Sequence, residues 1–194
     1  SDALVETNSI YIGNDPSSTT DDAQYNVGIG IDVFNSITSG DNNTAVGFYS
    51  LDANTSGEKN VALGGATLTD NTSGNNNVAI GYDALANATS LSSNVAVGTN
   101  AMKSTTSGDP STALGHRAME DNTSGGGNTA VGYLSLANNT TAGNNTAVGW
   151  GALTTNTIGD SNTAVGFYSL ATNTTGVDNV GVGLNALASN TIGQ

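Results

Sequence analysis

The sequence contains no cysteine and only three Lys or Arg residues, against 16 Asp and Glu residues. Without cysteine, the chain has neither disulfide bonds nor zinc–thiolate sites. Its net charge of −13 opposes binding to nucleic acid, because phosphate backbones need a basic surface. An anionic membrane surface would repel the chain for the same reason. We therefore expect no nucleic-acid partner.

Long hydrophobic runs and large apolar side chains are also scarce. No stretch approaches the roughly 20 apolar residues of a membrane-spanning helix, and no secretion signal is recognisable, so we expect no membrane insertion. Aromatic residues make up only 5% of the chain, and large aliphatic residues are thinly spread. Short segments of such a chain cannot build a core alone, so burial must come from stacking or from neighbouring chains.

What the sequence does have is a strict period. One glycine recurs every 17 residues without a missing copy or an insertion. These glycines are Gly13, Gly30, Gly47, Gly64, Gly81, Gly98, Gly115, Gly132, Gly149, Gly166 and Gly183. A fixed period of this length indicates one small unit stacked on itself. We therefore expect a rod, a shape suited to presenting or spacing something rather than to catalysis.

The unit that ends in this glycine reads Asn-(Thr/Val)-Ala-(Val/Ile/Leu)-Gly, as in residues 43–47. Branched residues at alternate positions favour a short strand, with Thr44 and Val46 on one face and Ala45 on the other. Because alanine keeps its face uniformly small, we expect that face to pack closely against another surface, such as a neighbouring chain. The asparagine row is expected to form an amide ladder, each side chain bonding to the copies above and below.

A second apolar row stands four residues after each glycine, as at Leu51 and Leu85. The spacing of Tyr82 and Leu85 suits a helical turn, and a second short strand is the open alternative. Each repeat then continues with Asn-Thr-Ser-Gly or a close variant, as at residues 54–57, which favours a polar turn. Threonine recurs at this turn in every copy from Thr38 to Thr191.

Together these patterns predict an all-β fold, a parallel β-solenoid or β-roll of eleven 17-residue repeats, with a short helical turn per repeat as one option. Corresponding residues would lie about 4.8 Å apart, and the rod would be roughly 50 Å long. Residues 1–25 depart most from the pattern and are expected to form an N-terminal cap or junction with a degenerate first repeat. Residues 26–194 are expected to form the repeat solenoid. The incomplete last repeat at Gln194 is what we expect of a piece cut from a longer fibre.

An aromatic row directly after the glycine is the most distinctive chemical feature. Tyr133, Trp150 and Phe167 occupy it in consecutive repeats and are the candidate ligand-contact residues. Exposed rings in file can stack on sugar faces, whereas buried rings fill gaps between repeats or chains, and packing is the favoured interpretation. His116, the single histidine, occupies the same row and is interpreted as a variant of it without a catalytic role.

Carboxylates are the other candidate chemical groups. An acidic row stands six positions before the glycine, at Asp41, Glu58, Asp109 and Asp160. Glycoside hydrolysis needs two carboxylates across a cleft, which a convex rod does not offer, so a solvated acidic edge is the favoured interpretation. Calcium ligation by Asp15, Asp21 and Asp22 is an alternative, but the spacing matches no established calcium loop. We expect no catalytic residue, no metal and no cofactor.

Two stretches resemble a known repeat, namely Asn-Thr-Ala-Val-Gly-Phe-Tyr-Ser-Leu at residues 43–51 and Asn-Thr-Ala-Val-Gly-Tyr-Leu-Ser-Leu at residues 128–136. They resemble the Asn-Thr-Ala-Val-Gly-Tyr-x-Ala-Leu repeats of bacterial trimeric adhesins and phage-like tail fibres. The Val-Ala-Ile-Gly core at residues 78–81 is similar to the heads of trimeric autotransporter adhesins, which usually have shorter repeats. The resemblance covers residues 26–194. It implies a homotrimer of parallel β-rolls packed side by side, located outside the cell on a cell surface or a virion fibre.

The function that this resemblance implies is attachment to a host or another surface, through a cell-surface glycan or a protein receptor. The expected chain is thus a non-enzymatic structural or adhesive segment of a trimeric fibre. An ice-binding solenoid is the first alternative, suggested by the threonine row, although the neighbouring position varies among Ser, Thr, Leu and Ile. A tailspike-type enzyme that degrades polysaccharide is the second alternative.

Overall fold

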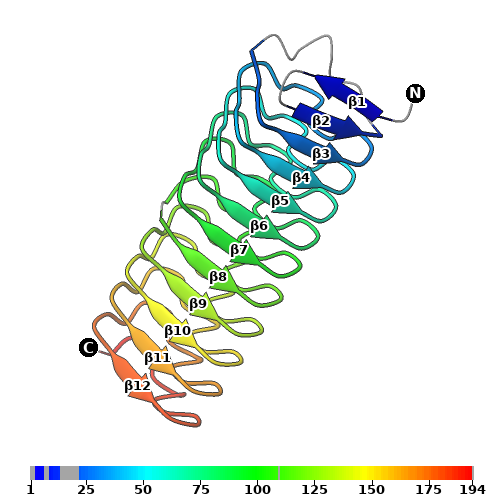
Figure 1. Ribbon diagram of the computed structural model, residues 1–194. Helices are drawn as coiled ribbons and strands as arrows, with labels where there is room; N and C mark the ends of the chain where they lie inside the picture. The colour runs from blue at the N-terminus through cyan, green and yellow to red at the C-terminus, as the bar shows by residue number, and fades with distance from the viewer. Residues whose placement is uncertain (1–2, 7–8, 14–21, 109, 194) are drawn as a thin grey trace.

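The computed structural model describes residues 3–6, 9–13, 22–108 and 110–193, which form a single sheet of short strands. The strands follow one another in sequence order along a rod (Figure 1). They are β1 (Ala3–Glu6), β2 (Ser9–Ile12), β3 (Val27–Ile29), β4 (Thr44–Val46), β5 (Val61–Leu63), β6 (Val78–Ile80), β7 (Val95–Val97), β8 (Thr112–Leu114), β9 (Thr129–Val131), β10 (Thr146–Val148), β11 (Thr163–Val165) and β12 (Val180–Val182).

Neighbouring strands from β2 to β12 are parallel and are offset by one 17-residue period. Thr146 of β10 pairs with Thr163 of β11, and Ala147 pairs with Ala164. Equivalent residues therefore lie in columns along the rod, and the predicted all-β parallel β-solenoid with one strand per 17-residue turn is confirmed. At the N-terminal end β2 is already in register with β3, while β1 pairs with β2 antiparallel. Residues 14–21 of the expected cap lie outside the described residues.

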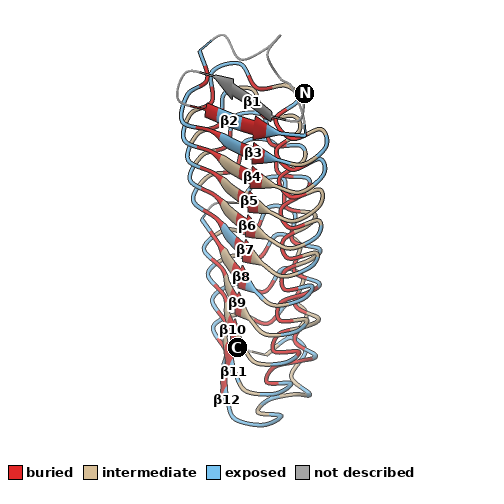
Figure 2. Cartoon of the chain, turned by 45° about the vertical axis from the view of Figure 1, so that its right-hand side comes forward, coloured by how far each residue is buried: buried red, intermediate tan, exposed pale blue. Residues whose placement is uncertain are grey.

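The alanine of each strand faces the inside of the solenoid. Ala45, Ala96 and Ala147 are fully buried within the single chain and share one core with the second apolar row (Figure 2). The alanine face does pack closely, as expected, but the suggestion that a neighbouring chain covers it is wrong. From β4 to β11 the column is alanine, because Leu51 and its equivalents fill the interior opposite the strands, whereas at the N-terminal end the buried ring of Tyr11 occupies the column beside Gly28.

The branched residues of each strand consequently point outward. In β4 the side chains of Thr44 and Val46 are half-buried on either side of buried Ala45. We call the outward residues of β3 to β12, which stand three and one positions before the glycine, the strand face. In β8 Leu114 is 47% exposed on this face, although leucine is usually a core residue.

The segment after the glycine is neither a helical turn nor a second strand in the described turns. Alternate residues of the segment have a positive φ, with Tyr49 at 56° and Leu51 at 51°. The backbone therefore has the repeating dihedral angles of neither a helix nor a strand. The Asn54 N–H donates to the Leu51 carbonyl at 3.2 Å within the turn, and the Leu51 N–H donates to the Thr67 carbonyl of the next turn at 3.0 Å. Positive φ is unfavourable for a leucine, so burial of its side chain and these bonds between turns must offset the strain.

Two asparagine ladders run through the interior. In the first, which the sequence predicts, the Asn60 Nδ2 donates to the Asn43 Oδ1 at 3.1 Å, and the Asn77 Nδ2 donates to the Asn60 Oδ1 at 3.1 Å. The second uses the asparagine of the polar turn, where the Asn156 Nδ2 donates to the Asn139 Oδ1 at 3.1 Å. All these side chains are buried, so the ladders supply most polar groups of the interior with partners, although the Asn145 Nδ2 of the first ladder has none.

The narrow interior gives a first testable prediction. Ala96→Leu should destabilise the chain by about 1–3 kcal/mol, because a larger side chain overpacks the buried alanine column. Val97→Ala on the strand face is the matched control and should cost less in an isolated chain, since Val97 is only half-buried. Urea unfolding followed by circular dichroism, with the chain dilute enough to be monomeric, measures both. Equal losses of stability would contradict this assignment of the two faces.

Candidate functional site

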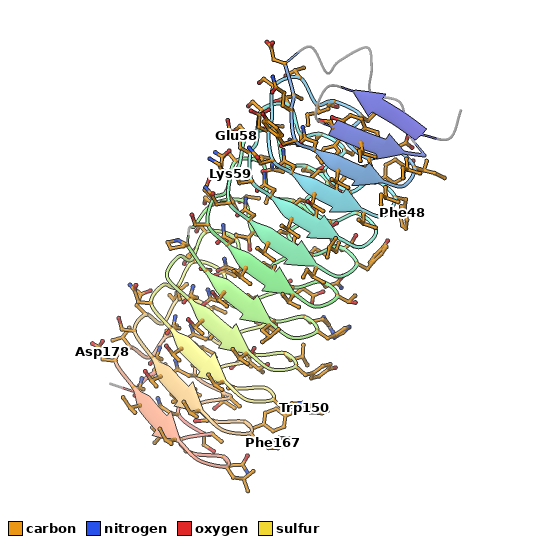
Figure 3. All side chains as sticks on the ribbon, in the orientation of Figure 1. Phe48, Glu58, Lys59, Trp150, Phe167 and Asp178 are labelled. Carbon is orange, nitrogen blue, oxygen red and sulfur yellow. The ribbon has the colours of Figure 1, made fainter. Side chains whose placement is uncertain are left out.

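The aromatic row lies along one edge of the strand face. Each ring follows the repeated glycine, where the backbone leaves the strand and the side chain turns outward. We call the exposed rings of this row and of the next position the aromatic ridge. It comprises Phe48, Tyr49, Tyr82, His116, Tyr133, Trp150, Phe167 and Tyr168. In Figure 3 the labelled rings Phe48, Trp150 and Phe167 project from the same side of the ribbon.

The three predicted ligand-contact residues form the continuous part of this ridge. The ring centroids of Tyr133 and Trp150 are 4.7 Å apart, and those of Trp150 and Phe167 are 6.2 Å apart. Trp150 is 51% exposed, Phe167 45% and Tyr133 38%. The sequence therefore correctly predicts that these rings are neighbours, and their exposure leaves them free to contact a ligand.

The rings do not share one plane. His116 stacks on Tyr133 with an interplanar angle of 8°, which supports its interpretation as a member of the row. Trp150 is tilted by 52° from Tyr133 and by 47° from Phe167. Trp150 has the largest exposed fraction of the three candidate rings, so it is the ring best placed for stacking on a ligand.

A second ring position was missed by the sequence reasoning. Tyr168 packs edge-on against Phe167 at 4.5 Å and extends the ridge sideways. Gly151 makes room for it, because a Cβ at that position would lie 2.5 Å from the nearest atom of the Tyr168 ring. In the sequence, this contact is signalled by a glycine at position 151 that is followed 17 residues later by the tyrosine at position 168. Tyr49 takes the equivalent position beside Phe48, with ring centroids 5.9 Å apart.

Charged side chains border the ridge on the side away from the strands. The Lys103 ammonium donates to Asp83 at 2.6 Å, and this hydrogen bond raises the pKa of Lys103. Arg117 pairs with Glu120, which also accepts a hydrogen bond from Asn100 at 3.0 Å. The hydrogen bond to Glu120 likewise raises the pKa of Arg117. Both cations are therefore neutralised locally, and they add polar groups beside the rings without making a basic patch.

The acidic row lies on the opposite edge of the strands from the ridge. Figure 3 shows Glu58 on that edge, away from Phe48 and Trp150. The Asp41 Oδ1 accepts the Gln24 N–H at 2.7 Å, and the Asp160 Oδ1 accepts the Gly143 N–H at 2.7 Å, so these carboxylates bridge adjacent turns. Asp109 lies outside the described residues. These contacts give the row a structural role, in addition to the solvated edge that the sequence predicts.

The calcium alternative falls largely on residues that are not described, since Asp15 and Asp21 are among them. Asp22 is exposed. Within the described ranges, no group of three or more His, Asp or Glu side chains is arranged to hold a metal ion. The same ranges contain no helix with the length and hydrophobicity required to cross a membrane.

The threonine row lies at an outer corner of the turns, away from the strand face. The Thr55 hydroxyl donates to the Thr72 carbonyl of the next turn at 2.9 Å, and the Thr123 hydroxyl donates to the Thr140 carbonyl at 2.8 Å. These hydroxyl protons are used within the chain, so the row serves to join turns. Ice binding by this row stays a prediction, because these hydrogen bonds do not test it.

Comparison of the chain with protein-family models, with curated proteins and with solved structures gives no match.

Proposed function

We propose that this chain is a structural and adhesive segment of a homotrimeric fibre located outside the cell, on a cell surface or a virion. The observation that carries the proposal is the unbroken register of the turns, with β2 to β12 stacked one per period along a straight rod (Figure 1). Such a rod extends in one dimension and holds its side chains in fixed columns, as suits a part that spaces or presents a binding surface. The resemblance of residues 26–194 to adhesin and tail-fibre repeats supports the same function.

The test of this proposal is the mass of the particle in solution. Sedimentation equilibrium at micromolar concentration should give three times the chain mass of 19.2 kDa. A trimer is expected because each turn buries little apolar surface of its own and leaves branched residues exposed. A stable monomer under these conditions would count against the fibre.

The adhesive role is proposed to reside in the aromatic ridge, with Tyr133, Trp150 and Phe167 contacting a cell-surface glycan or a protein receptor. The exposure of these rings and the pair of Arg117 and Glu120, of which Arg117 interacts with Tyr133, combine the two features that sugar recognition uses. No catalytic step is proposed, because the acidic row is on the other edge, where the carboxylates of Asp41 and Asp160 bond to backbone and that of Glu58 pairs with Lys59.

Trp150→Ala tests the ridge directly. On a glycan array, the substitution should weaken binding by about tenfold or more, because an aromatic anchor is often the dominant contact of an interface. Tyr82→Ala is the matched control, since it removes an exposed ring of the same row outside the continuous part. If Trp150→Ala binds as the parent chain does, the ridge is not the adhesive surface.

A further inference from the structure

We propose that the strand face is the surface through which copies of this chain pack against one another. The inference deepens the proposed fibre by naming the shared surface, and it takes the number of copies from that proposal. The occupant of the face is a second copy of the same chain, as four properties of the face indicate: its hydrophobicity, its size, its lack of charge and its period.

The strand face from β3 to β12 is largely apolar and carries no polar residue other than threonine. The position immediately before the glycine is Val, Ile or Leu in every repeat, and the position two residues earlier is Val or Thr in these strands. In the single chain, Ile29 is 40% exposed, Leu114 47% and Val165 36%. An outward sheet face that met only water would carry polar residues, so this pattern indicates a covered surface.

The face is also larger than an ordinary exposed apolar patch. Two side-chain columns are about 14 Å wide and ten parallel strands span about 48 Å, which gives roughly 670 Å² of flat area. The largest apolar patch on a typical monomer is about 300–600 Å². In a trimer each copy divides this face between two neighbours, so the face forms the apolar centre of each contact and the flanking residues complete it. Branched side chains lose little rotamer freedom on burial, which favours association further.

The strand face is the uncharged strip of a strongly acidic chain. None of the 16 acidic residues and none of the three Lys or Arg residues stands at its positions. Two copies of a chain with net charge −13 repel each other if they meet through other faces, for example where Asp160 and Asp178 are exposed. Because the strand face carries no carboxylate, two copies can meet through it without placing acidic residues of this face opposite one another.

The period of the face selects its partner. Its side chains repeat every turn along the whole rod, so a complementary surface must repeat at the same spacing. A second copy of the chain has the same spacing because it has the same repeat. Its columns of side chains can therefore interdigitate with those of the first copy along the full length of the rod. Proteins without the same repeat would match the face over only a short part of it.

Sedimentation velocity on a charged variant tests the inference. Val97→Lys combined with Val131→Lys places two like charges on the face of each copy and should weaken association at least 100-fold, giving a folded monomer at micromolar concentration. Asn87→Lys combined with Asn138→Lys is the matched control, because both asparagines are exposed on another face. This control should associate as the parent chain does. Circular dichroism checks that each variant keeps its strands.

A second measurement does not depend on the folding of the lysine variant. The chain lacks cysteine, so a single Val131→Cys substitution introduces a unique thiol at the centre of the face with little change in volume. Its reaction with a maleimide should be at least tenfold slower in the assembled protein than that of the Asn138→Cys control. Dilution to the monomer should remove most of the difference, leaving the part that comes from the half-buried position of Val131 in the single chain.

The outcomes separate the two proposals. If the parent chain is a trimer but the lysine variant also assembles, or if both thiols react equally fast in the trimer, the strand face is not the interface and the fibre stands. If the parent chain is a stable monomer, both the interface and the trimeric fibre are overturned. Protection of the Val131→Cys thiol with a monomeric lysine variant supports both.

Discussion

Gly98→Ala is expected to destabilise the solenoid by roughly 2–6 kcal/mol, combining an unfavourable backbone conformation with overpacking. Gly98 has φ +137°, a value that residues with a side chain rarely adopt. A Cβ there would lie 2.5 Å from the Gly115 carbonyl carbon of the next turn and overlap its oxygen. Gly115 cannot move away easily, because its N–H donates to the Val97 carbonyl at 2.8 Å.

Gly183→Ala separates the two causes. Gly183 has nearly the same backbone conformation, with φ +125°, but no atom lies within 4 Å of the position its Cβ would take. This variant should therefore lose only the conformational part, about 1–3 kcal/mol. Urea unfolding of the two variants and the parent chain measures the difference. If Gly183→Ala lowers the stability as much as Gly98→Ala does, close stacking of the turns is not the reason why a glycine stands at this position in every repeat.

Asn60→Ala should have the second large effect, a loss of roughly 2–6 kcal/mol, because it removes the four hydrogen bonds of a buried amide, each with a net contribution of about 0.5–1.5 kcal/mol. The Asn60 Oδ1 accepts the Asn77 backbone N–H at 3.0 Å, and the Asn60 Nδ2 donates to the Gly74 carbonyl at 2.8 Å. Asn60 is fully buried, so water cannot replace these bonds without opening the turn. Thermal unfolding followed by circular dichroism measures the loss.

Asn60→Ser is the control that the chain itself supplies. Ser111 occupies the same row, and its hydroxyl accepts the Asn128 backbone N–H at 3.2 Å. A serine at position 60 should likewise keep an acceptor for the backbone of the next turn, so its cost should be about half that of alanine. Equal stability of the serine and alanine variants would show that the ladder bonds to the backbone contribute little.

The stacking could be predicted from the sequence because it depends on spacing alone. A constant period with branched residues at Thr44 and Val46 specifies short strands, and equal spacing places them in register. The asparagine ladder followed from the same argument. Alternation also identified which residues share a face, but it could not decide which face is inside. Hydrophobicity alone favours valine for the interior, whereas the limited space opposite Leu51 admits only Ala45.

The turn segment could not be predicted, because its backbone contradicts local preferences. Tyr49 and Leu51 both adopt positive φ, which neither residue favours on its own, so no propensity indicates it. The conformation is imposed by hydrogen bonds to the adjacent turns, such as that from the Leu51 N–H to the Thr67 carbonyl. Tertiary contacts of this kind leave no local pattern in the sequence.

For the candidate site, the sequence predicted position but not orientation. Stacked turns place Tyr133, Trp150 and Phe167 side by side, because residues that are 17 positions apart lie in one column along the rod. The tilt of Trp150 depends on side-chain rotation, which the spacing does not determine. The contribution of Tyr168 depends on the missing side chain at Gly151, a pairing that is recognisable only when the turns are already stacked.

The repeated bonding between turns has an evolutionary consequence. Because Thr55, Thr72 and Thr123 make the same bond to the turn that follows, one internal turn can be removed or duplicated and the flanking turns can rejoin in register. Recombination between repeats of the gene would then change the reach of the protein in steps of about 4.8 Å while leaving the remaining surface intact. Length is thus a trait that can vary independently of the side chains on the remaining turns.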